Sequence, residues 1–278
     1  MTGRKYIMAI ITISRGVFSG GKELAECVAE RLGYQCISEE VIAEAASRYD
    51  TPYLELSRAL SADPGILEGM TLQRSHYLAY IASSLANHAK NERLVYHGHA
   101  GHLLLKAIPN ILRIKVTASI ENRVNAAMED RGLDHEQAVQ FILASDNARA
   151  RWERFLYHVD RSDISIYDFV IDIDRLTLTG ACDIVCFVAK REEYRETQTS
   201  QKLIDDLILA ADVRAKIASE AGARDDEIQV DALDEIITIS GSVPTTDDAD
   251  KIREVARQHP RVKGIISHMG VRWIASQG

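Results

Sequence analysis

A glycine-rich turn near the start of the chain carries the residues best suited to chemistry. The spacing Gly16-x-x-x-x-Gly21-Lys22 follows an apolar run and precedes an amphipathic segment, the order of a strand, a phosphate-binding loop and a helix. Glycines let backbone N–H groups turn towards phosphate oxygens, and the helix N-terminus adds partial positive charge. Lys22 would then reach the β- and γ-phosphates of a nucleotide. The alternative, a plain surface turn, leaves Lys22 without a role.

The residue after the lysine departs from this motif. The motif has Ser or Thr there, whose hydroxyl binds Mg²⁺, whereas this chain has Glu23. A carboxylate could bind magnesium directly or through water, and it could equally repel the donor phosphates. The predicted nucleotide-binding residues are Arg15, Gly16, Ser19, Gly20, Gly21, Lys22 and Glu23.

The composition indicates a soluble protein. A chain of 278 residues is long enough for one large domain or two smaller ones, and its net charge of −8 argues against nucleic-acid binding. The apolar run at residues 7–13 is too short for a membrane span or a signal peptide, so we expect a cytoplasmic protein. The four cysteines lack paired zinc-ligand spacing and are predicted to be buried structural residues.

Strand and helix patterns alternate up to about residue 192, which indicates parallel β-α-β units. Residues 193–202 are charged and rich in Gln and Thr, so we expect a linker there. Residues 203–278 then read as helix, two strands, helix and strand. The predicted fold is an α/β core over residues 1–192, with a parallel sheet flanked by helices, followed by a small α-β-β-α-β module.

The first part of the chain resembles the cytidylate kinase-like branch of the P-loop nucleoside monophosphate kinases. The resemblance covers about the first 190 residues and is carried by residues 11–15, 19–22, 29–33, 95–98, 146–154 and 167–174. The C-terminal module is similar to a BON domain, a small α/β module linked to membrane or small-ligand binding. That similarity is carried by a short signature within residues 236–243.

The resemblance implies a P-loop kinase core that uses ATP with Mg²⁺ and phosphorylates a nucleoside monophosphate, with cytidylate as the default acceptor. Such enzymes hold the acceptor in line with the γ-phosphate and neutralise the developing charge. Lys22 would bind the donor. An arginine cluster at the place of the family's lid, Arg149, Arg151 and Arg154, would stabilise the transferring group. The alternative for these arginines is a solvated charged helix.

The acceptor side departs from the family in two places. The turn after the third strand reads Gly98-His99-Ala100 where an arginine usually grips the acceptor phosphate, and Ser38 stands where an acid is expected. A neutral histidine grips phosphate less well than an arginine does. The predicted acceptor-binding residues are Arg74, His97, Gly98 and His99. The alternative is that the histidines cap the turn and pack against Tyr96.

Two functions remain open from the sequence. The intact Lys22 and the arginine cluster favour an enzyme that transfers a phosphoryl group from ATP to a nucleoside monophosphate. Glu23 and His99 favour a nucleotide-binding regulator with little or no catalysis, whose C-terminal module binds a protein partner, a small ligand or a membrane. The basic residues at 251–263 could meet anionic lipid or form a solvated face. The acceptor base and the oligomeric state are left open.

Overall fold

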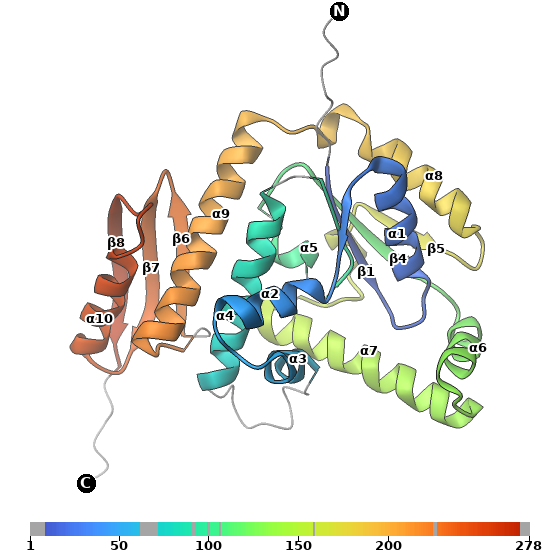
Figure 1. Cartoon of the computed structure of the whole chain (residues 1–278), viewed down its shortest axis with the longest axis horizontal. Helices are drawn as coiled ribbons and strands as arrows, with labels where there is room; N and C mark the ends of the chain where they lie inside the picture. The colour runs from blue at the N-terminus through green and yellow to red at the C-terminus, as the bar shows by residue number, and fades with distance from the viewer. Residues whose placement is uncertain are drawn as a thin grey trace, which may run out of the picture. The chain divides into compact units, whose positions relative to one another are not determined.

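The computed structural model describes residues 9–61, 72–90, 93–98, 101–105, 107–157, 159–224 and 227–272 (Figure 1). Backbone contacts divide the chain into two compact units that do not follow chain order. The first comprises Met1–Glu40, Ser61–Gly65 and Asn91–Ser200, and the second comprises Val41–Leu60, Ile66–Lys90 and Gln201–Gly278. Residues 41–60 and 66–90, which we expected in an N-terminal domain, thus group with the C-terminal residues. The family-based boundaries 1–192 and 203–278 stay a prediction.

A five-stranded parallel sheet forms the centre of the first unit. The strand order is β2-β3-β1-β4-β5, and β1 pairs with β3 on one side and β4 on the other. The strands are β1 (Ile10–Arg15), β2 (Gln35–Ile37), β3 (Leu94–Tyr96), β4 (Ile111–Thr117) and β5 (Phe169–Asp172). All residues of β1 but the last are buried, as expected for a central strand covered on both faces. The predicted α/β class with a parallel sheet is confirmed.

The helices α1 (Gly21–Leu32) and α8 (Leu178–Ala189) pack together over one face of this sheet (Figure 1). Ile11 and Ile13 of β1 meet Leu24 and Val28 of α1 in that core. Burial of each such side chain contributes about 1.5–3 kcal/mol. This core holds the end of β1 and the start of α1 in place, and therefore the loop between them.

The opposite face of the sheet carries polar side chains near the ends of the strands. Thr12 and Ser14 alternate with the isoleucines along β1, and Lys115 of β4 lies in register with Ser14. Three further helices belong to the same unit: α5 (Gly101–Leu104), α6 (Ile120–Arg131) and α7 (His135–Tyr157). The 3₁₀ turns η1 (Ile164–Ile166) and η2 (Glu192–Tyr194) complete it.

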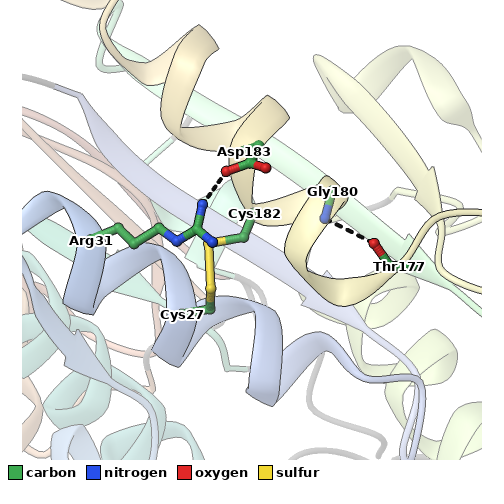
Figure 2. The surroundings of a disulfide bond; sticks show 6 residues. All are labelled: Cys27, Arg31, Thr177, Gly180, Cys182 and Asp183. Atoms are coloured by element: carbon green, nitrogen blue, oxygen red, sulfur yellow. Dashed lines mark hydrogen bonds and ion pairs between the residues drawn. A yellow bond between two sulfur atoms is a disulfide. The ribbon is translucent and has the colours of Figure 1, made fainter.

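A disulfide joins the two helices over the apolar face, between Cys27 of α1 and Cys182 of α8 (Figure 2). Arg31 and Asp183 form an ion pair beside it. Sequence spacing does not predict this pairing, because the two cysteines stand 155 positions apart. Disulfides are rare in a reducing cytoplasm. The cytoplasmic location therefore stays a prediction that this bond does not support. Within the ranges described above, no helix is both long and apolar enough to cross a membrane.

The second unit contains a three-stranded sheet of order β6-β7-β8. Its strands β6 (Ile228–Leu233) and β7 (Ile236–Val243) form an antiparallel hairpin, and β8 (Gly264–Val271) runs parallel to β7. The helix α9 (Gln198–Lys216), its π-helical end η3 (Ile217–Ala221) and α10 (Thr246–Arg257) supply the other elements of the module. The predicted α-β-β-α-β order is confirmed. The remaining helices of the unit are α2 (Glu40–Arg48), α3 (Tyr53–Ser61) and α4 (Leu72–Ala89).

The expected linker at residues 193–202 is partly helical. Thr197 Oγ1 accepts a hydrogen bond of 3.0 Å from the backbone N–H of Ser200, and α9 begins at Gln198. This local cap starts the helix within the segment that looked like a linker, because Thr and Ser favour helix starts as well as loops.

A polar cluster joins α9 to α2 and α4 inside the second unit. The Asp212 carboxylate accepts hydrogen bonds from Ser83 Oγ at 2.6 Å and from Asn87 Nδ2 at 2.9 Å. Arg48 Nη1 lies 3.7 Å from the same carboxylate, whose side chain is 24% exposed. Tyr49 adds a hydrogen bond of 2.8 Å to Ser83. Loss of this carboxylate would leave partly buried donors without an acceptor.

We predict that Asp212→Ala lowers the free energy of unfolding by about 1–3 kcal/mol, because unsatisfied partly buried groups cost that much. Guanidinium-induced unfolding of the full chain, followed by circular dichroism, measures the change. Asp250→Ala is the matched control, because Asp250 is 68% exposed and its ion pair with Arg253 lies within α10. Equal effects of the two substitutions would contradict a stabilising role for the cluster.

Candidate functional site

The loop between β1 and α1 is a tight turn in which glycine is required. Gly20 has a φ of 72°, and a Cβ at this position would collide with Ile173. Ser19 Oγ donates a 2.9 Å hydrogen bond to the carbonyl of Gly16, which closes the turn. Because α1 begins at Gly21, the first N–H groups of the helix are available to an anion in the loop. The local geometry is suited to holding phosphate.

The two charged residues that follow the loop, Lys22 and Glu23, are exposed. Lys22 Nζ lies 3.8 Å from Glu26 Oε1, one turn further along α1, and 59% of the lysine side chain is exposed. An exposed ion pair of this kind contributes about 0–1 kcal/mol to stability, so Lys22 could readily leave Glu26 and bind a phosphate instead. Mg²⁺ is usually held by one or two carboxylates and the substrate's phosphates, and the Glu23 carboxylate fits that donor set. Among the described residues, no group of three or more His, Cys, Asp or Glu is placed to hold a metal alone.

Two arginines converge on the carbonyl of Arg15, where the loop begins. Arg149 Nη1 of α7 donates to this oxygen at 3.4 Å, and Arg161 Nη2 donates to it as well. Arg161 also lies 3.5 Å from Ser14 Oγ. The side chain of Arg15 is half-buried, and its Nε has no hydrogen-bond partner in the described part of the chain. Three guanidinium groups therefore gather at the mouth of the loop.

This arginine cluster is short of negative charge. The pKa of Arg149 is lowered to about 10, mainly by burial and also by the nearby charges of Arg15 and Arg161. Asp146 and Glu153 oppose that shift without cancelling it. Burial likewise lowers the pKa of Arg15, against the charges of Glu23 and Glu39. Cations that burial and like charge both disfavour are stabilised by a bound anion, so the cluster is suited to a phosphate or phosphoryl group.

Three partly or fully buried polar residues, Lys115, Glu153 and Tyr167, lie beside the arginine cluster. Lys115 Nζ donates to the carbonyl of Arg161 at 2.9 Å and stands 5.4 Å from the ring centre of Tyr167. Burial raises the pKa of Glu153, although Arg161, Arg149 and Lys115 pull it down. Tyr167 donates to Ser14 at 3.3 Å. These contacts fix the segment that carries Arg161 against the polar face of the sheet.

The arginines predicted from the sequence do not all reach the loop. Arg149 does, but Arg151 and Arg154 are exposed, and Arg154 lies 3.7 Å from Asp160. The helix period explains the difference, because Asp146, Arg149 and Glu153 share one face of α7. The roles predicted for Arg151 and Arg154 stay predictions. Arg161 and Lys115 were missed: Arg161 lies in a turn without periodicity, and Lys115 is a polar residue within an apolar strand.

His97, one of the predicted acceptor-binding residues, follows β3 and is buried. Its pKa is lowered to about 4, mainly by burial and also by the charge of Arg15, so the imidazole is neutral at pH 7. Its Nδ1 has no hydrogen-bond partner among the residues that the structure describes. Gly98 packs against the ring of Tyr96 so closely that a Cβ would collide. His99 and the side chain of Arg74 lie outside the described residues.

We predict that acid destabilises the fold through His97 and His102. Both are buried, and their pKa values are lowered from 6.5 to about 4 and about 3. The unfolded chain therefore binds more protons between about pH 6.5 and pH 4, and stability falls as the pH is lowered through this range, by about 1 kcal/mol per pH unit for each histidine.

Denaturant unfolding at several pH values between 4 and 7 measures this slope. His102→Gln is expected to reduce the slope, whereas the exposed His135→Gln leaves it unchanged. An identical slope in His102→Gln and the wild type would show that His102 is not buried in its neutral form.

A family model described as the cytidylate kinase-like family matches residues 10–175 of the chain, which is more than half of it. The chain belongs to the cytidylate kinase-like family. A BON domain model matches residues 205–272. Both resemblances expected from the sequence are therefore confirmed. The family match contains the loop, α6, α7 and Arg161, so the arginine cluster lies within the kinase-like part.

Related proteins agree with this family. The chain is similar to the cytidylate kinase of Methanothrix thermoacetophila, with 28% identity over 177 residues, 63% of this chain and 94% of that protein. It is also similar to the cytidylate kinase of Sulfurisphaera tokodaii, with 28% identity over 170 residues, 60% of this chain and 87% of that protein. The solved structure of an uncharacterized protein from Eubacterium ventriosum superposes with a TM-score of 0.51 and 19% identity over 66% of this chain and 99% of that one, which shows the fold alone.

Proposed function

We propose that the chain is a nucleotide kinase that transfers the γ-phosphoryl group of ATP to a nucleoside monophosphate. The observation that carries this proposal is the meeting of Arg149 and Arg161 at the carbonyl of Arg15, next to a glycine loop built for phosphate. A phosphate loop alone would suit any nucleotide-binding protein. Three guanidinium groups short of negative charge at its mouth are suited to a transferring phosphoryl group.

In the proposed reaction the loop amides hold the donor phosphates, and Lys22 leaves Glu26 to bind them. The Glu23 carboxylate, in the first turn of α1, would hold Mg²⁺ bound with ATP, and the ion would supply positive charge to the donor phosphates. Arg15, Arg149 and Arg161 stabilise the charge on the group in transfer. The neutral His97 and Gly98 would contact the acceptor, and the acceptor-binding roles of Arg74 and His99 stay predictions. Cytidylate is the first acceptor to test, because the relatives bear that name.

A second candidate is a nucleotide-binding regulator. The position of Glu23, exposed in the first turn of α1 where the motif has a hydroxyl, is the observation that favours it. In this case ATP would bind without turnover, and the BON domain would bind a partner, a small ligand or a membrane. The same experiment separates the two functions.

We predict ADP production from ATP and Mg²⁺ with one acceptor among CMP, dCMP, UMP, AMP and GMP. Lys22→Ala should lower kcat about 100-fold to 1,000-fold, because loss of one preorganised charge contact to the reacting group costs that much. The exposed Lys190→Ala, at the end of α8, is the matched control and should keep wild-type turnover. If no acceptor supports ADP production while ATP still binds, the kinase proposal is contradicted and the regulator hypothesis is favoured.

A further inference from the structure

We propose that Arg123 is a positioning residue that fastens the phosphate loop to the hairpin formed by α6 and α7, and thereby sets the direction of the loop's amides. The inference deepens the proposed function, since it rests on the loop binding a nucleotide. Nothing in the sequence singled out Arg123, which lies near the start of α6.

The guanidinium of Arg123 contacts the loop and α7 at once. Its Nε donates to the carbonyl of Val17 at 2.9 Å, and its Nη2 lies 2.7 Å from Asp146 Oδ2 on α7. It also packs against Gly16, where an added Cβ would lie 2.8 Å from Nη2. Only 12% of the side chain is exposed. The planar fork of arginine makes these contacts together, which the single ammonium of lysine does not reproduce.

The apolar side chains of the loop enter the same hairpin. Val17 and Phe18 pack against the core that α6 and α7 share. The rings of Phe18 and Phe141 lie 6.2 Å apart, and the guanidinium of Arg131 stands over both of them. Phe18 has a φ of 56°, a left-handed conformation that is unfavourable for a residue with a Cβ. The hairpin supplies the packing that keeps this residue in place.

The bond to Val17 has a consequence for phosphate binding. A trans peptide is planar, and its carbonyl and the following N–H point in opposite directions. Because Arg123 holds the carbonyl of Val17, the N–H of Phe18 points away from Arg123. Arg149 and Arg161 act in the same way on the carbonyl of Arg15, which turns the N–H of Gly16 away from them. The hairpin and the arginine cluster thus fix the two peptides on either side of Gly16–Val17.

Asp146 connects this arrangement to the arginine cluster. It lies one turn before Arg149 on the same face of α7. One helix face therefore reaches the loop twice, at Val17 through Asp146 and Arg123, and at Arg15 through Arg149. Any change in the Arg123 contact alters the amides that hold the donor and the cation that faces the transferring group.

The test uses the full chain with Arg123→Gln, Arg123→Lys and Asp146→Asn. Arg113→Gln is the matched control, since Arg113 also forms an ion pair with an aspartate, Asp168, at 3.1 Å. That pair connects β4 to the residue before β5 and not to the loop. Calorimetric titration gives the Kd for ATP, steady-state kinetics give kcat and KM, and thermal unfolding of the free protein reports stability.

We expect Arg123→Gln to weaken ATP binding at least 10-fold and to lower kcat further, with a loss of thermal stability no greater than that of Arg113→Gln. Arg123→Lys should recover part of the stability but little of the ATP affinity. Asp146→Asn should shift ATP binding in the same direction, and the double variant should lose less than the sum of the two. If Arg123→Gln does not fold, Arg123→Lys carries the test.

An ATP Kd within twofold of the wild type in Arg123→Gln, or an equal loss in Arg113→Gln, would overturn the inference. If the wild type binds ATP but phosphorylates no acceptor, the kinase proposal fails while the effect of Arg123 on ATP affinity still decides the inference. Absence of ATP binding to the wild type would overturn both.

Discussion

The site depends on holding several arginine side chains close together in a partly buried position. Arg15, Arg149 and Arg161 carry like charges, and burial makes the charges of Arg15 and Arg149 more costly still. A backbone carbonyl partly stabilises these charges, because the oxygen of Arg15 accepts hydrogen bonds from the other two arginines. A phosphate bound in the loop would stabilise them further by its negative charge. The surrounding structure, from the apolar core under β1 to the α6–α7 hairpin, keeps these groups together before any ligand binds.

The second unit joins the C-terminal module to helices from the first third of the chain. Asp212 of α9 accepts hydrogen bonds from α4, and the carbonyl of Ala223 lies 3.1 Å from His76 Nε2, also on α4. Arg74, a predicted acceptor-binding residue, lies on α4. A ligand of the BON domain would therefore act on helices that are packed against it, which gives the regulator hypothesis a physical basis alongside catalysis.

The sequence was sufficient where the signal is local. The glycine spacing predicted the loop, and alternating strand and helix patterns predicted the parallel sheet. Both signals depend on residues that are close together in the sequence. Among the arginines predicted on α7, Arg149 contacts the loop, whereas the roles of Arg151 and Arg154 stay predictions, since spacing alone does not tell which helix face meets the loop. Arg123, Arg161 and the Cys27–Cys182 bond join distant segments, so only tertiary packing reveals them. Burial, which no spacing encodes, makes His97 a neutral group.

In the proposed reaction, Arg149 faces the transferring group rather than the bound donor. The most direct test compares the affinity of wild type, Arg149→Gln and Arg154→Gln for ATP and for a bisubstrate analogue that joins the donor and acceptor nucleotides through phosphates. We expect Arg149→Gln to lose about 100-fold or more in affinity for the analogue but about fivefold or less for ATP, because such a residue acts mainly on the developing charge. Equal losses for both ligands, or a larger effect at Arg154, would contradict it.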